Sequence, residues 1–94
     1  MSPDNLELKP QNIVGVGASN SKTRFTIQLT NMTWCAELLI QNGQIYGVIQ
    51  DEYGVPLDDG HQILGWLLSR PEFILRMLEL ARKNGVESSL GNYS

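Results

Sequence analysis

Apolar and polar residues alternate along three central segments of the chain, which is typical of β-strands that bury one face. The segments are "RFTIQLT" at 24–30, "WCAELLI" at 34–40 and "QIYGVIQ" at 44–50. The last two are joined by Asn42-Gly43, a dipeptide suited to a two-residue hairpin turn because both residues tolerate a positive φ. A further strand at 12–16 is weakened by a glycine. The pattern predicts a three- or four-stranded antiparallel β-meander.

The turn at Asn42-Gly43 fixes how the flanking strands pair. The expected pairs are Ile40 with Ile45, Leu38 with Gly47 and Ala36 with Ile49. Carried back across "TNMT", the alternation predicts the pairs Leu29 with Trp34, Ile27 with Ala36 and Phe25 with Leu38. All these residues then lie on one side of the sheet, as a sheet packed on a core requires.

The other side of the predicted sheet is less polar than a solvated face. It carries Cys35, Leu39, Tyr46 and Val48 among polar residues. We therefore expect a cover: the N-terminal arm, a helix or another subunit. A second layer from the same chain is the favoured interpretation.

Residues 58–84 predict two helices. Asp58 or Asp59 suits the N-cap of the first, which is rich in leucine. "SRPE" at 69–72 predicts the start of the second, because the serine and glutamate have capping-box spacing and proline fits the first turn. Gly85 is suited to the position just after the helix ends.

The second helix carries apolar residues on two of its sides. Leu75 and Leu80 lie off the centre of the stripe expected to be buried. One side must meet the sheet, so we expect the other to meet the first helix or a second molecule.

These elements predict one α+β domain, with the meander followed by two C-terminal helices. Its expected parts are a flexible arm at 1–11, the meander at 12–51, the helices at 58–84 and a loose tail at 86–94. The chain has 94 residues, of which 41% are hydrophobic and 18% charged. This low charge favours association with another surface.

The charge and cysteine content of the chain limit the classes of partner and the compartment that we expect. A formal net charge of −3 argues against bulk nucleic-acid binding, which needs clustered Lys and Arg. The chain has no long apolar run, and its first ten residues carry acids where a signal peptide is cationic. The single cysteine, Cys35, fits a reducing compartment. We therefore expect a cytoplasmic protein with no membrane contact.

The stretch "GVGASNSKTRF" at 15–25 has the composition of a phosphate-binding loop but not its spacing. A P-loop needs glycine where Val16 and Ser21 stand. The stretch remains either a flexible hairpin loop or an anion-binding nest of backbone donors. The candidate anion-binding residues are Lys22, Thr23, Arg24, Arg70 and Arg76.

Signals for catalysis or metal binding are lacking in the sequence. His61 is the only histidine, so a metal site lacks ligands, and the acids between Asp51 and Asp59 do not follow calcium-loop spacing. No nucleophile motif is present. We expect a protein that is not an enzyme and that has no cofactor.

Residues 58–83 resemble the tail segment of many small bacteriophage accessory proteins, in which an aspartate, a short helix and a "PE" joint precede a leucine-rich helix. The upstream strand "QIYGVIQ" also fits this resemblance. The matching positions are Asp59, Ile63, Pro71, Glu72, Leu75 and Leu78. The resemblance implies a phage or mobile-element product that binds and blocks a host factor, including defence proteins or their nucleotide signals, in the host cytoplasm.

Two functional hypotheses follow. In the first, the protein binds another protein or itself, as a homo-oligomer, through an interface formed by Leu39, Tyr46, Val48, Leu75 and Leu80. In the second, an oligomer is a receptor or sponge for a small anionic ligand such as a nucleotide, held by the candidate anion-binding residues. An unrecognised small enzyme is the third alternative.

Overall fold

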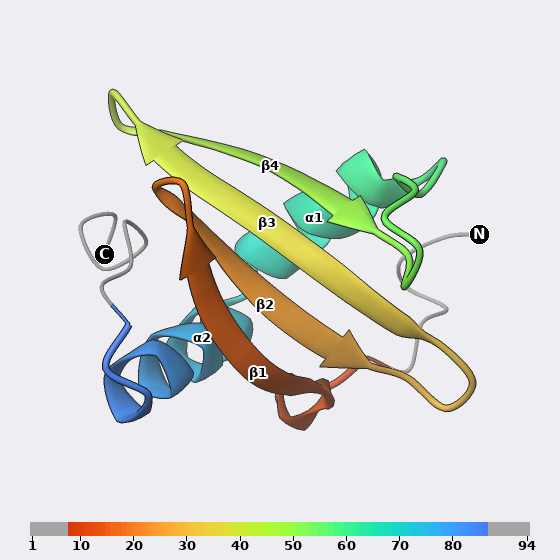
Figure 1. Ribbon diagram of the computed structural model, residues 1–94, viewed down its shortest axis with the longest axis horizontal. Coiled ribbons are helices and arrows are strands. Elements are labelled where there is room, and N and C mark those ends of the chain that lie inside the picture. The colour runs from red at the N-terminus through yellow and green to blue at the C-terminus, as the bar shows by residue number, and fades with distance from the viewer. Residues whose placement is uncertain (1–7, 87–94) are drawn as a thin grey trace.

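A computed structural model describes residues 8–86 as a four-stranded antiparallel sheet followed by two helices (Figure 1). The sheet order is β1-β2-β3-β4, with each strand beside the next in sequence. In chain order the elements are η2 (Pro10–Asn12), β1 (Ile13–Ser19), β2 (Lys22–Gln28), β3 (Thr33–Gln41), β4 (Gln44–Gln50), α1 (Gly60–Leu68) and α2 (Pro71–Lys83). The predicted α+β meander with C-terminal helices is confirmed.

The predicted arm and tail are described only in part. Leu8 is buried and the 3-10 turn η2 follows it, so the described end of the arm is packed on the core. Residues 1–7 and 87–94 lie outside the described residues, and they include nearly all of the predicted tail.

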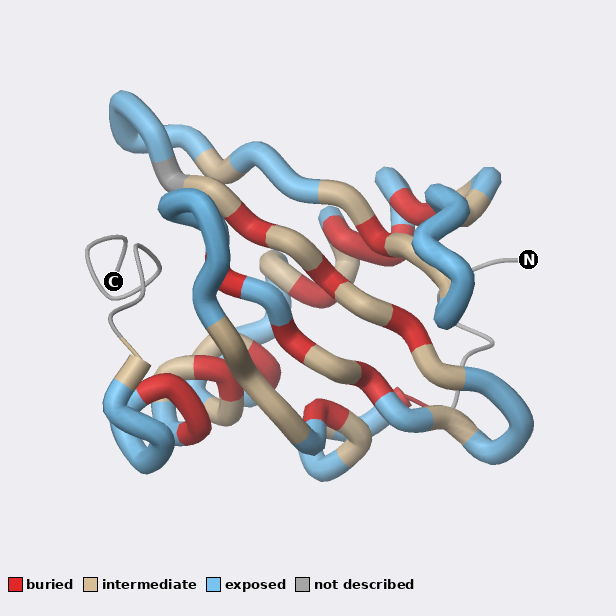
Figure 2. Tube along the Cα trace, in the orientation of Figure 1, coloured by how far each residue is buried: buried red, intermediate tan, exposed pale blue. Residues whose placement is uncertain are grey.

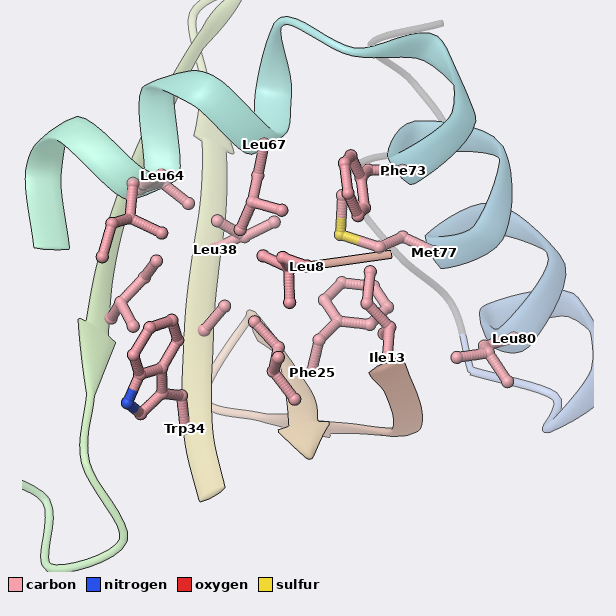
Figure 3. Packing of buried hydrophobic residues seen from close by; sticks show 14 residues of the cluster. Leu8, Ile13, Phe25, Trp34, Leu38, Leu64, Leu67, Phe73, Met77 and Leu80 are labelled. Carbon is pink, nitrogen blue, oxygen red and sulfur yellow. The ribbon is translucent and has the colours of Figure 1, made fainter. Parts of the chain in front are cut away.

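Both helices lie on the same face of the sheet, where they enclose the hydrophobic core (Figures 1 and 2). Helix α1 packs on β4 and α2 on β1, so together they cover the sheet from edge to edge. Phe25 lies at the centre of this core, between the sheet and α2 (Figure 3). The largest fully buried side chains are Phe25, Phe73, Ile13, Ile27, Leu38, Ile49, Ile63 and Thr23.

The β3–β4 hairpin has the predicted register. Its pairs include Ile40 with Ile45, Leu38 with Gly47 and Ala36 with Ile49. Asn42 and Gly43 have φ values of 56° and 76°, as a turn with two positive φ angles requires. The turn chemistry of one dipeptide therefore set the register of this pair of strands.

The predicted β2–β3 register is wrong by two residues. The observed pairs are Ile27 with Trp34, Phe25 with Ala36 and Thr23 with Leu38. The connection is tighter than expected, because the amide of Leu29 donates to the carbonyl of Met32 at 2.8 Å. A shift of two preserves the alternation, so the predicted residues still face the core although their partners differ.

The stretch at 15–25 is a strand hairpin, which corrects both the loop and the nest interpretations. Strand β1 extends to Ser19, which pairs with Lys22 across a two-residue turn. Asn20 and Ser21 occupy that turn with φ values of 51° and 69°. The two strands run antiparallel with paired backbone groups, so these residues form no loop of free amide donors around an anion.

The positive φ of Ser21 makes a stabilising substitution predictable. Glycine adopts this conformation without a Cβ penalty, so Ser21→Gly should raise the free energy of unfolding by about 0.5–1 kcal/mol. Urea unfolding of the purified protein measures the change. Ser19→Gly, in the neighbouring strand, is the control and should lower stability; a loss of stability in Ser21→Gly would contradict the turn assignment.

The helix ends differ from the predicted caps in two respects. Asp59 is the N-cap of α1 by position, although its side chain makes no cap hydrogen bond. Pro71 opens α2 as predicted, but the capping box is absent, because the Ser69 hydroxyl donates to the carbonyl of Trp66 at 2.7 Å. Gly85 has a φ of 67° and ends α2 as expected.

Candidate functional site

The sheet face opposite the helices is the candidate functional surface of this protein. No element within residues 8–86 covers it, because α1 and α2 both pack on the other side (Figure 1). The expectation of a second layer from the same chain is therefore wrong for the described residues. Both helices pack instead on the face that carries Phe25 and Ile27, because the larger set of apolar side chains lies there.

Side chains of all four strands reach this open face by strand alternation. One row across it is formed by Gly17, Arg24, Glu37 and Val48, which are paired in that order. A neighbouring row is formed by Gly15, Thr26, Cys35 and Gln50, paired in the same way. The β3 and β4 ends of these rows carry larger side chains than the β1 ends, so the face is uneven.

The open face contains a hollow of about 610 Å³, which is lined by residues of all four strands and which we call the glycine hollow. Its lining includes Gly15, Gly17, Arg24, Thr26, Cys35 and Gln50, with Asp51, Glu52 and Gly54 at one end. A Cβ on Gly17 would meet no atom within 4 Å, so missing side chains create the space. The volume lies within the range of protein binding pockets.

The β3–β4 half carries an apolar patch made of Leu39, Tyr46 and Val48. Tyr46 is 50% exposed and pairs with Leu39 across the two strands. The three residues line a smaller hollow of about 250 Å³, together with Lys22 and Glu37. The structure therefore brings together three of the five residues predicted for an interface.

The other two predicted interface residues lie on α2, away from the open face. Leu75 is 65% exposed, as an interface residue should be. Leu80 is 7% exposed and belongs to the core, so its assignment to an interface is corrected. Leu80 is buried because it lies on the side of α2 that faces the sheet, together with Phe73 and Met77 (Figure 3).

Charge at the centre of the open face is arranged around Glu37. Its carboxylate lies 3.3 Å from Nε of Arg24 and 3.9 Å from Nζ of Lys22. A hydrogen bond from the Arg24 guanidinium to the Cys35 side chain, and then the Glu37 carboxylate, raise the pKa of Arg24 above its ordinary value. Arg24 is therefore a fixed cation at neutral pH.

Acidic residues border the glycine hollow where the loop after β4 begins. Asp51 and Glu52 both line it. One carboxylate oxygen of Asp51 accepts from the amides of Tyr53 and Val55, at 2.8 and 2.9 Å, and so holds the loop in shape. The hollow thus has a cation on one side and two anions on another.

The structure does not assemble the five candidate anion-binding residues. Lys22 and Arg24 lie on the open face, beside Glu37. Thr23 is 2% exposed and faces the core, which removes it as a surface ligand. Arg70 lies over the Trp66 ring at 4.6 Å, and Arg76 donates to the carbonyl of Ile13 at 3.1 Å, both in the helix layer. One small anion cannot contact both layers of a single copy, and the notion of an anion site built from all five residues would need a site shared between subunits.

Two further searches of the described residues give negative results. Within residues 8–86 no group of three or more His, Cys, Asp or Glu side chains is placed to hold a metal ion. None of the helices described there is both long enough and apolar enough to cross a membrane.

Comparison with known proteins provides no relative. No protein-family model matches the sequence, and neither the curated proteins nor the solved structures contain a match.

Sequence reasoning missed the residues that give this face its shape and charge. The sequence predicts Gly15 as a weak point of a short strand and Gly17 as part of a loop, so their role as the floor of a hollow was not foreseen. Glu37 was not singled out, although its place in β3 opposite Arg24 follows from the observed register. A correct β2–β3 register would have identified the pair, because opposite charges on paired residues are a recognisable signal.

Proposed function

We propose that this protein is a non-catalytic binding protein that docks another protein surface on the open face of its sheet. The observation that carries the proposal is the apolar patch: Leu39, Tyr46 and Val48 lie exposed or half-buried on a face that no described element covers. Exposed apolar patches with a polar rim are characteristic of protein interaction sites. Lys22 and Glu37 supply that rim here.

The charges on the open face favour a protein over a small anion. Arg24 and Lys22 are both bridged to Glu37, and Asp51 and Glu52 border the adjoining hollow. A phosphate placed there would compete with Glu37 and be repelled by the two acids. A protein surface can instead supply both signs of charge in matching positions.

The resemblance to bacteriophage accessory proteins extends this proposal to a biological role. It makes the protein a phage or mobile-element product whose target is a host factor in the host cytoplasm. In that role, binding alone is enough to block the target, and the protein needs no catalytic residue.

Site-specific photo-crosslinking tests where the protein binds. Benzoylphenylalanine replaces Tyr46 on the open face or, as the matched control, Leu75 on the helix layer, since both positions are exposed. We expect position 46 to give several-fold more protein adduct than position 75 in cells that express the full chain. More adduct from position 75 would contradict the proposal.

A further inference from the structure

The outer edge of β4 carries backbone hydrogen-bonding groups that have no partner. β4 is the last strand of the sheet, so only its inner edge pairs with β3 (Figure 1). The carbonyl of Ile49 points outward, because it accepts from the amide of Leu57 at 2.9 Å. Backbone groups alternate in direction along an antiparallel strand, so those of Gly47 and Ile45 point outward as well. Within residues 8–86 nothing bonds these outward groups of Gly47 and Ile45.

The chain adds a short segment of its own to one end of this edge. Gln50 forms an isolated antiparallel bridge with Pro56, and Leu57 follows with its hydrogen bond to Ile49. The edge therefore already accepts an extended segment at its C-terminal end. The rest of the edge, over residues 44–48, remains open to another strand.

The open part of the β4 edge lacks the features that protect edge strands from pairing with another chain. Those features are charged side chains, prolines and bulges. The sequence "QIYGV" at 44–48 has no charge and no proline, and its register with β3 is unbroken. β1, the other edge strand, has a register shift between Ile13 and Gly15, and Arg76 bonds the Ile13 carbonyl. Of the two edges, β4 is therefore the less protected.

The apolar patch lies directly beside this edge. Tyr46 and Val48 belong to β4 itself, and Leu39 is the neighbour of Tyr46 on β3. A strand added at β4 places every second side chain on the open face, next to Tyr46 and Val48. Gly47 is exposed and has no side chain, so the backbone between these two residues is accessible. Backbone bonding and apolar contact are thus available to the same segment.

A second copy of β4 would match these backbone groups but not the side chains. Only one antiparallel register bonds Ile45 and Gly47 of both copies, namely Ile45 of each copy with Gly47 of the other. That register places Gln44 beside Val48 at both ends, so a polar amide meets an apolar side chain twice. A segment of different sequence can instead present an apolar residue to Val48.

We propose that the partner docks by adding an extended segment of its own as a fifth strand beside β4, with apolar side chains facing Tyr46 and Val48. The outward backbone groups of Ile45 and Gly47 supply the hydrogen bonds, and the apolar patch selects the segment, as in other cases of strand addition. This inference rests on the proposed function, because it identifies the part of the partner that binds the same surface.

A proline at position 45 tests the added strand. Proline has no amide hydrogen, and an edge strand tolerates it where the amide faces outward. Ile45→Pro should therefore lower the adduct yield from benzoylphenylalanine at position 46 by about tenfold, because one partner carbonyl loses its donor.

Ala18→Pro is the matched control for this variant. Ser19 and Lys22 pair across a two-residue turn, so the amide of Ala18 faces outward from the β1 edge. The adduct yield from position 46 should then stay within about twofold of the parent, as for a surface substitution. Circular dichroism checks that both proline variants are folded.

A second measurement does not depend on the fold of a variant. Mass spectrometry identifies the partner segment in the position 46 adduct, and this segment is synthesised as a peptide with one amide at a time N-methylated. An added strand donates to β4 only from every second residue, so affinity for the wild-type chain should fall about tenfold at alternate residues and little between them. A peptide that does not bind, or a loss without alternation, would show that β4 does not receive an extended segment.

The outcomes separate this inference from the proposed function. An unchanged adduct yield in folded Ile45→Pro would overturn the added strand but leave the open face as the docking surface. An adduct between two copies of this chain would also overturn the inference, because the occupant would then be β4 itself. More adduct from position 75 than from position 46 in the otherwise wild-type chain would contradict both.

Discussion

Replacing Gly47 by alanine is expected to lower the free energy of unfolding by about 1–3 kcal/mol, the usual cost of overpacking a core. A Cβ at this position would lie 2.8 Å from Cδ2 of Leu38 and of Leu64, and 2.9 Å from the carbonyl oxygen of Glu37. The leucine side chains can rotate, but the Glu37 carbonyl belongs to the neighbouring strand. Strands β3 and β4 must therefore separate locally, which also disturbs the contact of β4 with α1 that closes one side of the core.

Gly17→Ala is the matched control for this prediction. Gly17 is also a strand glycine, yet a Cβ there would meet nothing within 4 Å. Its substitution should leave stability within about 0.5 kcal/mol or raise it slightly, because alanine loses less backbone entropy on folding. Urea unfolding of both variants at a concentration where the association state is known gives the comparison. Equal stability of the two variants would show that α1 does not pack on Gly47 as described.

Turn chemistry explains why one hairpin was predicted correctly and the others were not. Asn42-Gly43 permits essentially one kind of two-residue turn, so the register of β3 and β4 followed from the sequence. "TNMT" contains no glycine, and the alternation of Phe25 and Ile27 is equally satisfied by a register shifted by two. Alternation determines which face a residue occupies, whereas only the turn determines its partner.

Only the first part of strand β1 was predicted, as a strand at 12–16, because the rest of its sequence resembles a loop. Gly15 and Gly17 weaken strand propensity, and the polar residues of the Asn20-Ser21 turn extend the loop-like composition. The strand forms because pairing with β2 satisfies its backbone, and because Ile13 and Val16 pack on the core. Tertiary pairing overrode local propensity here.

The sequence predicted which apolar residues form the candidate site, but it did not predict the shape of that site. The second sheet face was already too apolar for solvent in the sequence, and Leu39, Tyr46 and Val48 were identified with it. Alternation does not determine which face of the sheet the two helices cover, because this depends on tertiary packing. The glycine hollow could not be foreseen either, since it depends on β1 as a strand.

Truncating Phe25 to alanine is expected to lower the free energy of unfolding by about 3–5 kcal/mol, the largest effect of a single substitution proposed for this chain. Phe25 is 0% exposed, and its ring lies between the sheet and α2 (Figure 3). Removing the ring loses its transfer free energy and leaves a cavity, because the surrounding strands are fixed by pairing on both sides of β2. A loss of this size is a large share of the roughly 5–15 kcal/mol that stabilises a typical domain.

Tyr53→Ala provides the control for loss of an aromatic ring, since Tyr53 is 83% exposed and lies in the loop after β4. It should change stability by no more than about 0.5 kcal/mol. Denaturant unfolding measures both variants and is followed by tryptophan fluorescence, since Trp34 is buried in the same core and Trp66 packs against it. The midpoint should fall for Phe25→Ala with an unchanged denaturant slope, as for a folded protein with a weakened core. A loss below about 1 kcal/mol would mean that the space between sheet and helices can collapse around the missing ring, and Phe25 would then not be the centre of a rigid core.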